Sequence, residues 1–203
     1  MRQVLVVHFS QTGQLDRLVR SVCAPLEKAF GVQVDYLPLQ PAQPFPFPWP
    51  FLGFFRIFPE TVLMRPQPLL PLQVDADKRY DLIILAYQVW FLSPSLPVTS
   101  FLASPEAARL FKDAPVVTLI GCRNMWLMAQ EKVKAKLTEL GARLVDNIAL
   151  TDACGTAASF LATPLWMFTG RQKPYAWVPR AGIEEAEIAA ASRFGEAMAQ
   201  RLT

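Results

Sequence analysis

The chain has few of the residues from which metal sites and disulfide frameworks are built. Its 203 residues contain a single histidine, His8, and three widely spaced cysteines, Cys23, Cys122 and Cys154. An odd number of cysteines without metal-ligand spacing does not fit the common disulfide or zinc patterns. We therefore expect no metal site and a reducing, cytoplasmic location.

Charged residues are also scarce. Asp, Glu, Lys and Arg make up 18% of the chain, whereas hydrophobic residues make up 52%. The net charge is +3, and basic residues form no long run, so nothing indicates nucleic-acid binding. This composition predicts a large core and an apolar surface patch, and it permits weak attraction to anionic lipid headgroups.

Long uninterrupted apolar segments are absent. A membrane-spanning helix needs about 20 apolar residues. Residues 45–58 come nearest to that length, but prolines and an arginine interrupt them. The apolar stretch at residues 4–7 is too short for a signal peptide, so we expect neither a membrane span nor a targeting segment.

Short apolar runs alternate with helical patterns along the chain. The runs predict buried strands at residues 4–9, 82–86 and 116–120, with weaker candidates at 32–37 and 144–150. Helical periodicity occurs in residues 15–26, 126–140 and 188–202, and two short pieces lie between 93 and 111. This alternation predicts an α/β fold with a doubly wound five-stranded parallel sheet in the order 2-1-3-4-5.

Two segments rich in proline and aromatic residues interrupt the pattern, at about residues 38–77 and 153–181. We interpret them as insertions in a single domain that spans residues 1–203. Segments this apolar must cover something. The candidates are a substrate channel or lid, a membrane contact, the interface of a homodimer, or packing against each other.

The loop after the first predicted strand is the strongest functional signal. It contains Ser10, Gln11, Thr12, Gly13, Gln14 and Leu15. Backbone N–H groups at a helix start bind anions, hydroxyl groups donate further hydrogen bonds, and a glycine lets the backbone approach closely. The pattern predicts a site for a phosphate monoester. The alternative is an ordinary helix start capped by Ser or Thr.

Two further loops follow the third and fourth predicted strands. The first contains Gln88, Val89, Trp90 and Phe91, and the second contains Gly121, Arg123 and Asn124. Aromatic side chains can cover a flat ring, or they can pack against the insertion. Arg123 and Asn124 offer hydrogen-bond donors to ring carbonyls, or they are a surface charge and a helix cap. All three loops leave the same edge of the sheet, which favours one shared ligand site.

These residues resemble known flavin sites. Ser10-x-Thr12-Gly13 after a valine-rich strand resembles the flavodoxin phosphate loop. Residues 87–96 resemble the loop beside the flavin in flavodoxins and flavodoxin-like quinone reductases. The resemblance implies a flavodoxin-like fold that binds FMN at the three loops. Flavodoxins usually carry a further hydroxyl where Leu15 stands, whereas some quinone reductases carry an aliphatic residue there.

Longer strings in residues 45–50, 86–95, 118–131 and 147–151 resemble the flavodoxin-like proteins named dialkylresorcinol condensing enzyme. Condensation itself requires an acyl-carrying nucleophile, usually a cysteine beside histidines, and this chain has only His8. The resemblance instead implies aromatisation of a dialkyl cyclohexane-1,3-dione beside a separate ketosynthase, a two-electron oxidation.

The resulting hypothesis is an FMN-dependent oxidoreductase that acts on a hydrophobic cyclic dione or quinone. An electron-transfer flavodoxin fits less well, since those proteins are typically acidic. The alternative from another class is a flavin-free partner or scaffold protein in a lipid-derived biosynthetic pathway. No catalytic residue is assigned. His8 is either a core histidine or a proton carrier, and Cys122 is either a packed residue or a nucleophile.

Overall fold

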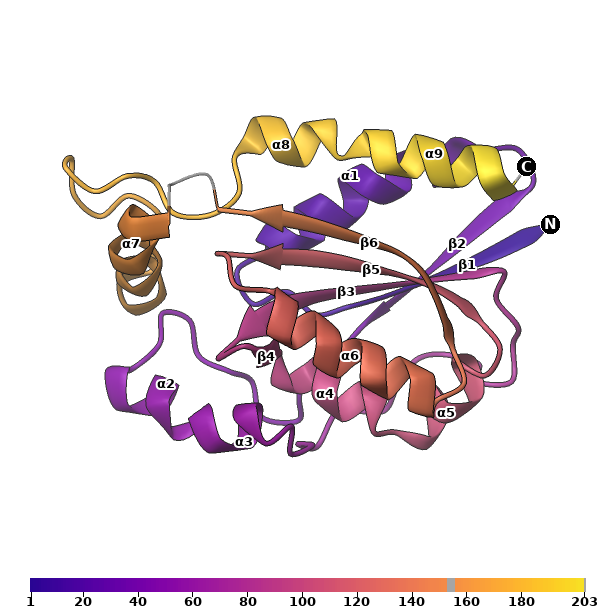
Figure 1. Ribbon diagram of the computed structural model, residues 1–203, viewed down its shortest axis with the longest axis horizontal. Coiled ribbons are helices and arrows are strands. Elements are labelled where there is room, and N and C mark those ends of the chain that lie inside the picture. The colour runs from indigo at the N-terminus through magenta and orange to yellow at the C-terminus, as the bar shows by residue number, and fades with distance from the viewer. Residues whose placement is uncertain (153–155, 203) are drawn as a thin grey trace.

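A parallel sheet forms the centre of the fold, and helices cover both of its faces (Figure 1). The computed structural model describes residues 1–152 and 156–202. The strands are β1 (Arg2–His8), β2 (Val32–Pro38), β3 (Leu82–Trp90), β4 (Ser93–Pro94), β5 (Pro115–Cys122) and β6 (Arg143–Thr151). The helices are α1 (Gln14–Lys28), α2 (Phe51–Arg56), α3 (Phe58–Val62), α4 (Leu96–Leu102), α5 (Pro105–Leu110), α6 (Leu127–Glu139), α7 (Thr156–Thr169), α8 (Glu185–Ala190) and α9 (Ser192–Leu202).

The five long strands are parallel and lie in the order β2-β1-β3-β5-β6. The predicted α/β class and the order of these strands are therefore confirmed. The structure adds β4, a two-residue strand that pairs antiparallel with the end of β3. None of the helices within residues 1–152 and 156–202 is long and apolar enough to cross a membrane.

Several element boundaries differ from the prediction. The strand predicted to end at Ala86 continues to Trp90. Tyr87 and Gln88 pair with β5, and Val89 and Trp90 pair with β4. Gln88, Val89 and Trp90 thus lie on a strand rather than in a loop. The C-terminal helix is interrupted at Ala191, which divides it into α8 and α9.

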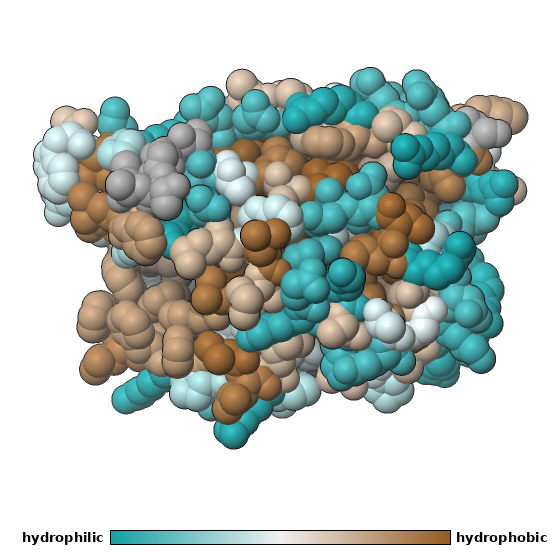
Figure 2. All heavy atoms as spheres, in the orientation of Figure 1, coloured by the Kyte–Doolittle hydropathy of each residue, from teal (hydrophilic) through white to brown (hydrophobic). Residues whose placement is uncertain are grey.

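The two predicted insertions place α2 and α7 at the end of the sheet to which the parallel strands point (Figure 1). The first contains α2 and α3, and the second contains α7 and the loop after it; residues 153–155, including Cys154, lie outside the described residues. The insertions contact each other: the backbone N–H of Trp49 donates to the Met167 carbonyl at 2.8 Å, and the Phe54 and Phe168 ring centroids are 5.7 Å apart. Hydrophobic residues gather on the surface around α2 (Figure 2).

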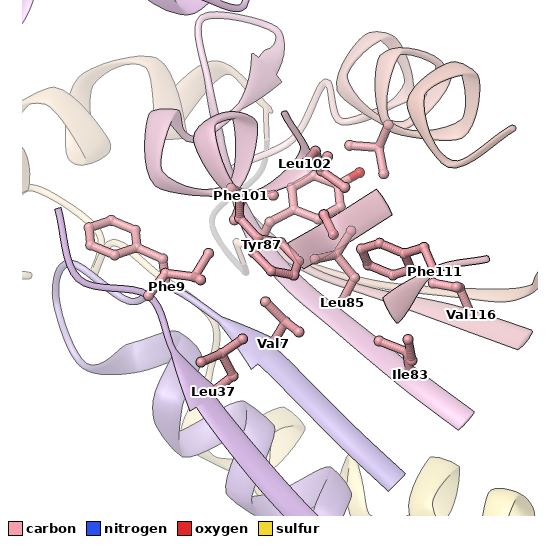
Figure 3. Packing of buried hydrophobic residues seen from close by; sticks show 14 of the residues in the cluster. Val7, Phe9, Leu37, Ile83, Leu85, Tyr87, Phe101, Leu102, Phe111 and Val116 are labelled. Carbon is pink, nitrogen blue, oxygen red and sulfur yellow. The ribbon is translucent and has the colours of Figure 1, made fainter. Parts of the chain in front are cut away.

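Each face of the sheet has its own hydrophobic core. On one face, Val7, Leu85 and Tyr87 pack beneath Phe101 and Phe111 (Figure 3). The opposite face is covered by α1, α8 and α9 through residues such as Leu15, Leu18 and Val22. A Cβ atom at Gly195 of α9 would overlap the Val22 carbonyl oxygen of α1, so glycine permits the close crossing of these helices.

Candidate functional site

The loop between β1 and α1 is built as an open helix start. The N-cap of α1 is Gly13, which has φ of 77° and makes no side-chain cap hydrogen bond. The hydroxyl oxygens of Ser10 and Thr12 are buried and have no hydrogen-bond partner in the part of the chain that the structure describes. These hydroxyls therefore do not cap the helix, and the interpretation as an ordinary Ser/Thr-capped start is wrong.

Space and charge around this loop favour an anion. A Cβ atom built on Gly13 would meet no atom within 4 Å. The first N–H groups of a helix lack intrahelical partners, and the helix dipole attracts negative charge there. A cavity of about 300 Å³ beside Thr12 is also lined by Arg17 and Arg180. Both guanidinium groups share one carboxylate, that of Glu185, at 3.0 and 3.2 Å, so the cluster keeps a net positive charge.

A larger cavity of about 400 Å³ lies at the carboxyl ends of β3, β5 and β6. Most of the residues predicted from sequence line it: Gln11, Thr12, Gln14, Gln88, Val89, Trp90, Phe91, Gly121, Arg123 and Asn124. Ser10 instead borders two neighbouring cavities. Gly13 stands at the helix start, and the Leu15 side chain is buried in the core. Leu15 can therefore offer a ligand only its backbone.

Three glutamines join the segments around the cavity. The Gln11 N–H approaches the Gln88 Oε1 at 3.4 Å, and the Gln11 Nε2 donates to the Pro46 carbonyl at 2.9 Å. Gln14 makes two hydrogen bonds of 3.2 Å to the backbone of Ile183. The side chains of Gln11 and Gln14 thus hold the loop against the first insertion and the segment before α8.

In the loop after β5, Asn124 does not have the helix-capping role that the sequence left open. The N-cap of α6 is Trp126, and the Asn124 Oδ1 accepts the Met125 N–H at 2.8 Å, so Asn124 is not the helix cap. Arg123 lies over the Phe160 ring, 4.0 Å from its centroid. Gly121 borders the cavity, but a Cβ atom there would lie 3.1 Å from the Leu15 side chain. A glycine at this position therefore allows α1 to pack closely on β5.

The aromatic residues at the end of β3 have different surroundings. Trp90 is 8% exposed, and the centroid of its ring lies 5.1 Å from that of Phe45 and 6.0 Å from that of Trp49. Most of the indole surface is therefore buried, in part by packing against the first insertion. Phe91 and Leu92 form the two-residue turn between β3 and β4, with φ of 47° and 59°. Such strained turns are often found at ligand sites.

Several cavity residues were not predicted from the sequence. They are Phe47, Phe54, Leu92, Cys122, Met125, Asp152, Phe160, Thr163, Pro164, Trp166, Met167 and Gly182. Asp152 directly follows β6. Candidates came only from the residues after the first, third and fourth predicted strands, and including those after the fifth strand would have found Asp152. Its carboxylate accepts the Thr163 hydroxyl at 3.3 Å. The lining residues of the insertions gave no such signal, because nothing in their pattern separates lining residues from buried ones.

The two residues considered for chemistry lie in different cavities. The thiol of Cys122 lines the large cavity, and burial raises its pKa to about 12. It is therefore protonated at neutral pH, which favours the interpretation as a packed residue. His8 lines a separate cavity, where its Nε2 lies 3.2 Å from the Asp16 carboxylate. Burial lowers the pKa of His8, while Asp16 opposes that effect.

No protein-family model matches the sequence, and no curated protein matches it. Solved structures do match its architecture. A flavoprotein from Lactobacillus acidophilus NCFM, determined in complex with FMN, matches with a TM-score of 0.59 at 11% identity, over 73% of this chain and 93% of that one. Flavodoxin 1 from Bacillus cereus, in its oxidised state, matches with a TM-score of 0.51 at 12% identity, over 99% of both chains. A flavodoxin from the domain Archaea matches with a TM-score of 0.51 at 11% identity, over 100% of this chain and 99% of that one.

The chain has a flavodoxin-like fold. In such folds the strand order reverses between β1 and β3, and ligands bind outside the carboxyl ends of the strands at this point. The open loop with Ser10 and Thr12 follows β1 there, and the large cavity lies beside it. The flavodoxin-like fold therefore places the open start of α1 and the large cavity at the same switch point.

Proposed function

We propose that the chain binds FMN. The observation that carries this proposal is the pair of buried, unpartnered hydroxyls of Ser10 and Thr12 at the open start of α1. Buried hydroxyls without a hydrogen bond are costly, and a phosphate at this position would accept from both. The FMN bound by the Lactobacillus flavoprotein is consistent with this assignment.

The residues around the cavity fit the rest of that cofactor. The phosphate would lie against Ser10, Thr12 and the first N–H groups of α1, with Arg17 and Arg180 adding positive charge nearby. The flavin ring would lie in the large cavity beside Phe91. The polar groups of Gln88, Arg123 and Asn124 line the same cavity and can face the polar edge of the ring.

The same proposal extends to an oxidoreductase with a hydrophobic cyclic dione or quinone as substrate. Bound FMN would supply a two-electron acceptor or donor. The cavity walls that would position the substrate and exclude water are apolar, with Phe54 from α2 and Trp166 and Met167 from α7. The resemblance to dialkylresorcinol proteins points to oxidation of a dialkyl cyclohexane-1,3-dione to a resorcinol, which removes two electrons and two protons.

Flavin titration tests cofactor binding and the position of the phosphate. Fluorescence quenching gives Kd for FMN and for riboflavin, which lacks the phosphate. The wild type should prefer FMN, and Ser10→Ala combined with Thr12→Ala should remove most of that preference. Each lost hydrogen bond to a charged group costs about 1.5–3 kcal/mol, which is roughly tenfold or more in Kd.

Thr138→Ala, at an exposed hydroxyl on α6, is the matched control and should bind FMN like the wild type. A wild-type chain that binds no flavin would contradict the proposal and would favour the flavin-free partner protein. An unchanged preference for FMN in the double variant would show that the phosphate lies elsewhere.

A further inference from the structure

Hydrophobic side chains are unusually exposed at the end of the molecule where the insertions meet. On α2 and at the start of α3, Phe51, Leu52, Phe55 and Phe58 are between 46% and 68% exposed. Figure 2 shows hydrophobic residues gathered over this region. Monomeric proteins rarely expose large contiguous apolar patches unless those patches bind something.

The second insertion extends the same surface. Phe51 lies 5.4 Å from Phe168 between ring centroids, so α2 and α7 are in contact. Phe160 on α7 is 57% exposed. In the loop after α7, Tyr175 and Trp177 stack on each other with an interplanar angle of 11°, and Trp177 is 71% exposed. We call these exposed residues of α2, α3, α7 and the following loop the apolar end.

The charges at the apolar end are almost all of one sign. Arg56, Arg65, Arg171 and Lys173 are exposed, and none has an acidic partner within residues 1–152 and 156–202. In residues 45–74 and 156–184 the acidic residues are Glu60, which is only partly exposed, and Glu184, which is exposed at the N-cap of α8. The apolar end therefore combines exposed aromatic rings with unpaired positive charge.

We propose that the apolar end docks on the surface of an anionic lipid membrane. Amphipathic surfaces of this kind insert apolar side chains at the headgroup boundary and pair their basic residues with lipid phosphates. Trp and Tyr are enriched at that boundary, which accounts for the exposed Tyr175–Trp177 pair. Because Phe54 and Met167 line the large cavity, docking would bring that cavity close to the lipid.

The charge pattern favours a membrane over a second copy of this chain. A symmetric dimer through the apolar end would bring the unpaired basic residues of both copies together, and like charges in an interface repel. An anionic membrane instead offers lipid phosphates as partners to these residues. This inference does not depend on whether FMN is bound.

Co-sedimentation with vesicles tests the proposal on the full chain. The wild type should bind vesicles of phosphatidylcholine with about 30% phosphatidylglycerol more tightly than pure phosphatidylcholine vesicles. Salt should weaken this binding. Each basic residue near such a surface contributes on the order of fivefold, so Arg56→Gln, Arg171→Gln and Lys173→Gln together should lower the partition coefficient about a hundredfold. Tryptophan emission should shift to shorter wavelength on binding, and Trp177→Phe should remove much of that shift.

Matched controls lie at the other end of the strands. Lys28→Gln, Lys112→Gln and Arg143→Gln remove three exposed charges there and should leave binding nearly unchanged. Leu52→Gln should weaken binding, whereas Phe30→Gln, at a 99% exposed phenylalanine before β2, should not. The proposal would be overturned if the wild type did not bind anionic vesicles, or if the two triple Gln variants lost binding equally. A stable dimer that buries Trp177 would also overturn it.

Discussion

At the scale of single residues, the backbone of Gly13 separates an anion site from an ordinary helix start. Its φ of 77° is unfavourable for residues with a Cβ atom, yet the structure places nothing within 4 Å of the position that a Cβ would take. That open space is what a bound phosphate would require. A side chain here should therefore affect the ligand far more than the fold.

Gly13→Val should abolish FMN binding and lower stability by about 1–2 kcal/mol through backbone strain. Gly31→Val is the matched control, because Gly31 has φ of 76° and the same open surroundings on the turn before β2. Both variants should lose similar stability in urea unfolding, but only Gly13→Val should lose flavin binding in fluorescence titration. Full affinity in Gly13→Val would place the phosphate elsewhere.

The largely buried imidazole of His8 should make stability fall in mild acid. Burial lowers the pKa of His8 below 6.5, so the unfolded chain binds this proton more readily than the folded one. Above pH 6.5 His8 is neutral in both states and does not lower the free energy of unfolding. As the pH falls from 6.5 through the folded pKa, proton binding by the unfolded chain lowers that free energy. Urea unfolding at pH 8 and pH 5.5 should show a larger loss in the wild type than in His8→Gln. An equal loss in both would mean that other groups control the acid response.

At the scale of elements, the packing of α9 on α1 depends on one small residue. A Cβ atom at Gly195 would overlap the Val22 carbonyl oxygen and lie 3.0 Å from Pro25. Helical propensity would favour alanine at such a position, so tertiary packing has overridden local preference here. The two helices can accommodate a larger residue only by moving apart.

Gly195→Ala should therefore destabilise the fold by about 1–3 kcal/mol, as overpacking does in dense cores. Gly53→Ala, in α2, is the matched control, because a Cβ atom there would lie 3.6 Å from Pro50, at an ordinary contact distance. That control should gain up to about 1 kcal/mol from helix propensity. Chemical denaturation of both variants measures the difference, and a gain in both would show that the crossing of α1 and α9 is looser than described.

At the scale of the whole molecule, the large cavity is closed by segments far apart in the sequence. Phe54 comes from the first insertion and Met167 from the second, while Val89 and Cys122 come from the sheet. Within residues 38–77 and 156–181, the residues that line the cavity carry no titratable group. A cavity of that kind suits a hydrophobic substrate whose reactive part reaches the sheet edge.

If the chain has the proposed oxidoreductase function, Phe54→Ala should reduce kcat/KM for long-chain cyclic diones about tenfold relative to short-chain ones, because it removes an apolar wall. Phe55→Ala is the matched control: it truncates the neighbouring ring, which is 48% exposed and does not line the cavity. FMN affinity should stay near that of the wild type in both. A proportional loss for both chain lengths in Phe54→Ala would assign that ring to structure alone.

The amino-acid sequence by itself determined the α/β class, the order of the five long strands and the loop with Ser10 and Thr12. Buried strands, amphipathic helices and helix starts leave local patterns, and parallel topology brings the carboxyl ends of strands together. Only the tertiary structure decided that the Leu15 side chain enters the core, that Trp90 packs against Phe45 and Trp49, and that Asn124 is not a helix cap. It also selected Phe54 of α2 and Met167 of α7 as cavity walls. These outcomes depend on which distant segments meet, and the local periodicity of a helix or strand does not encode its tertiary partners.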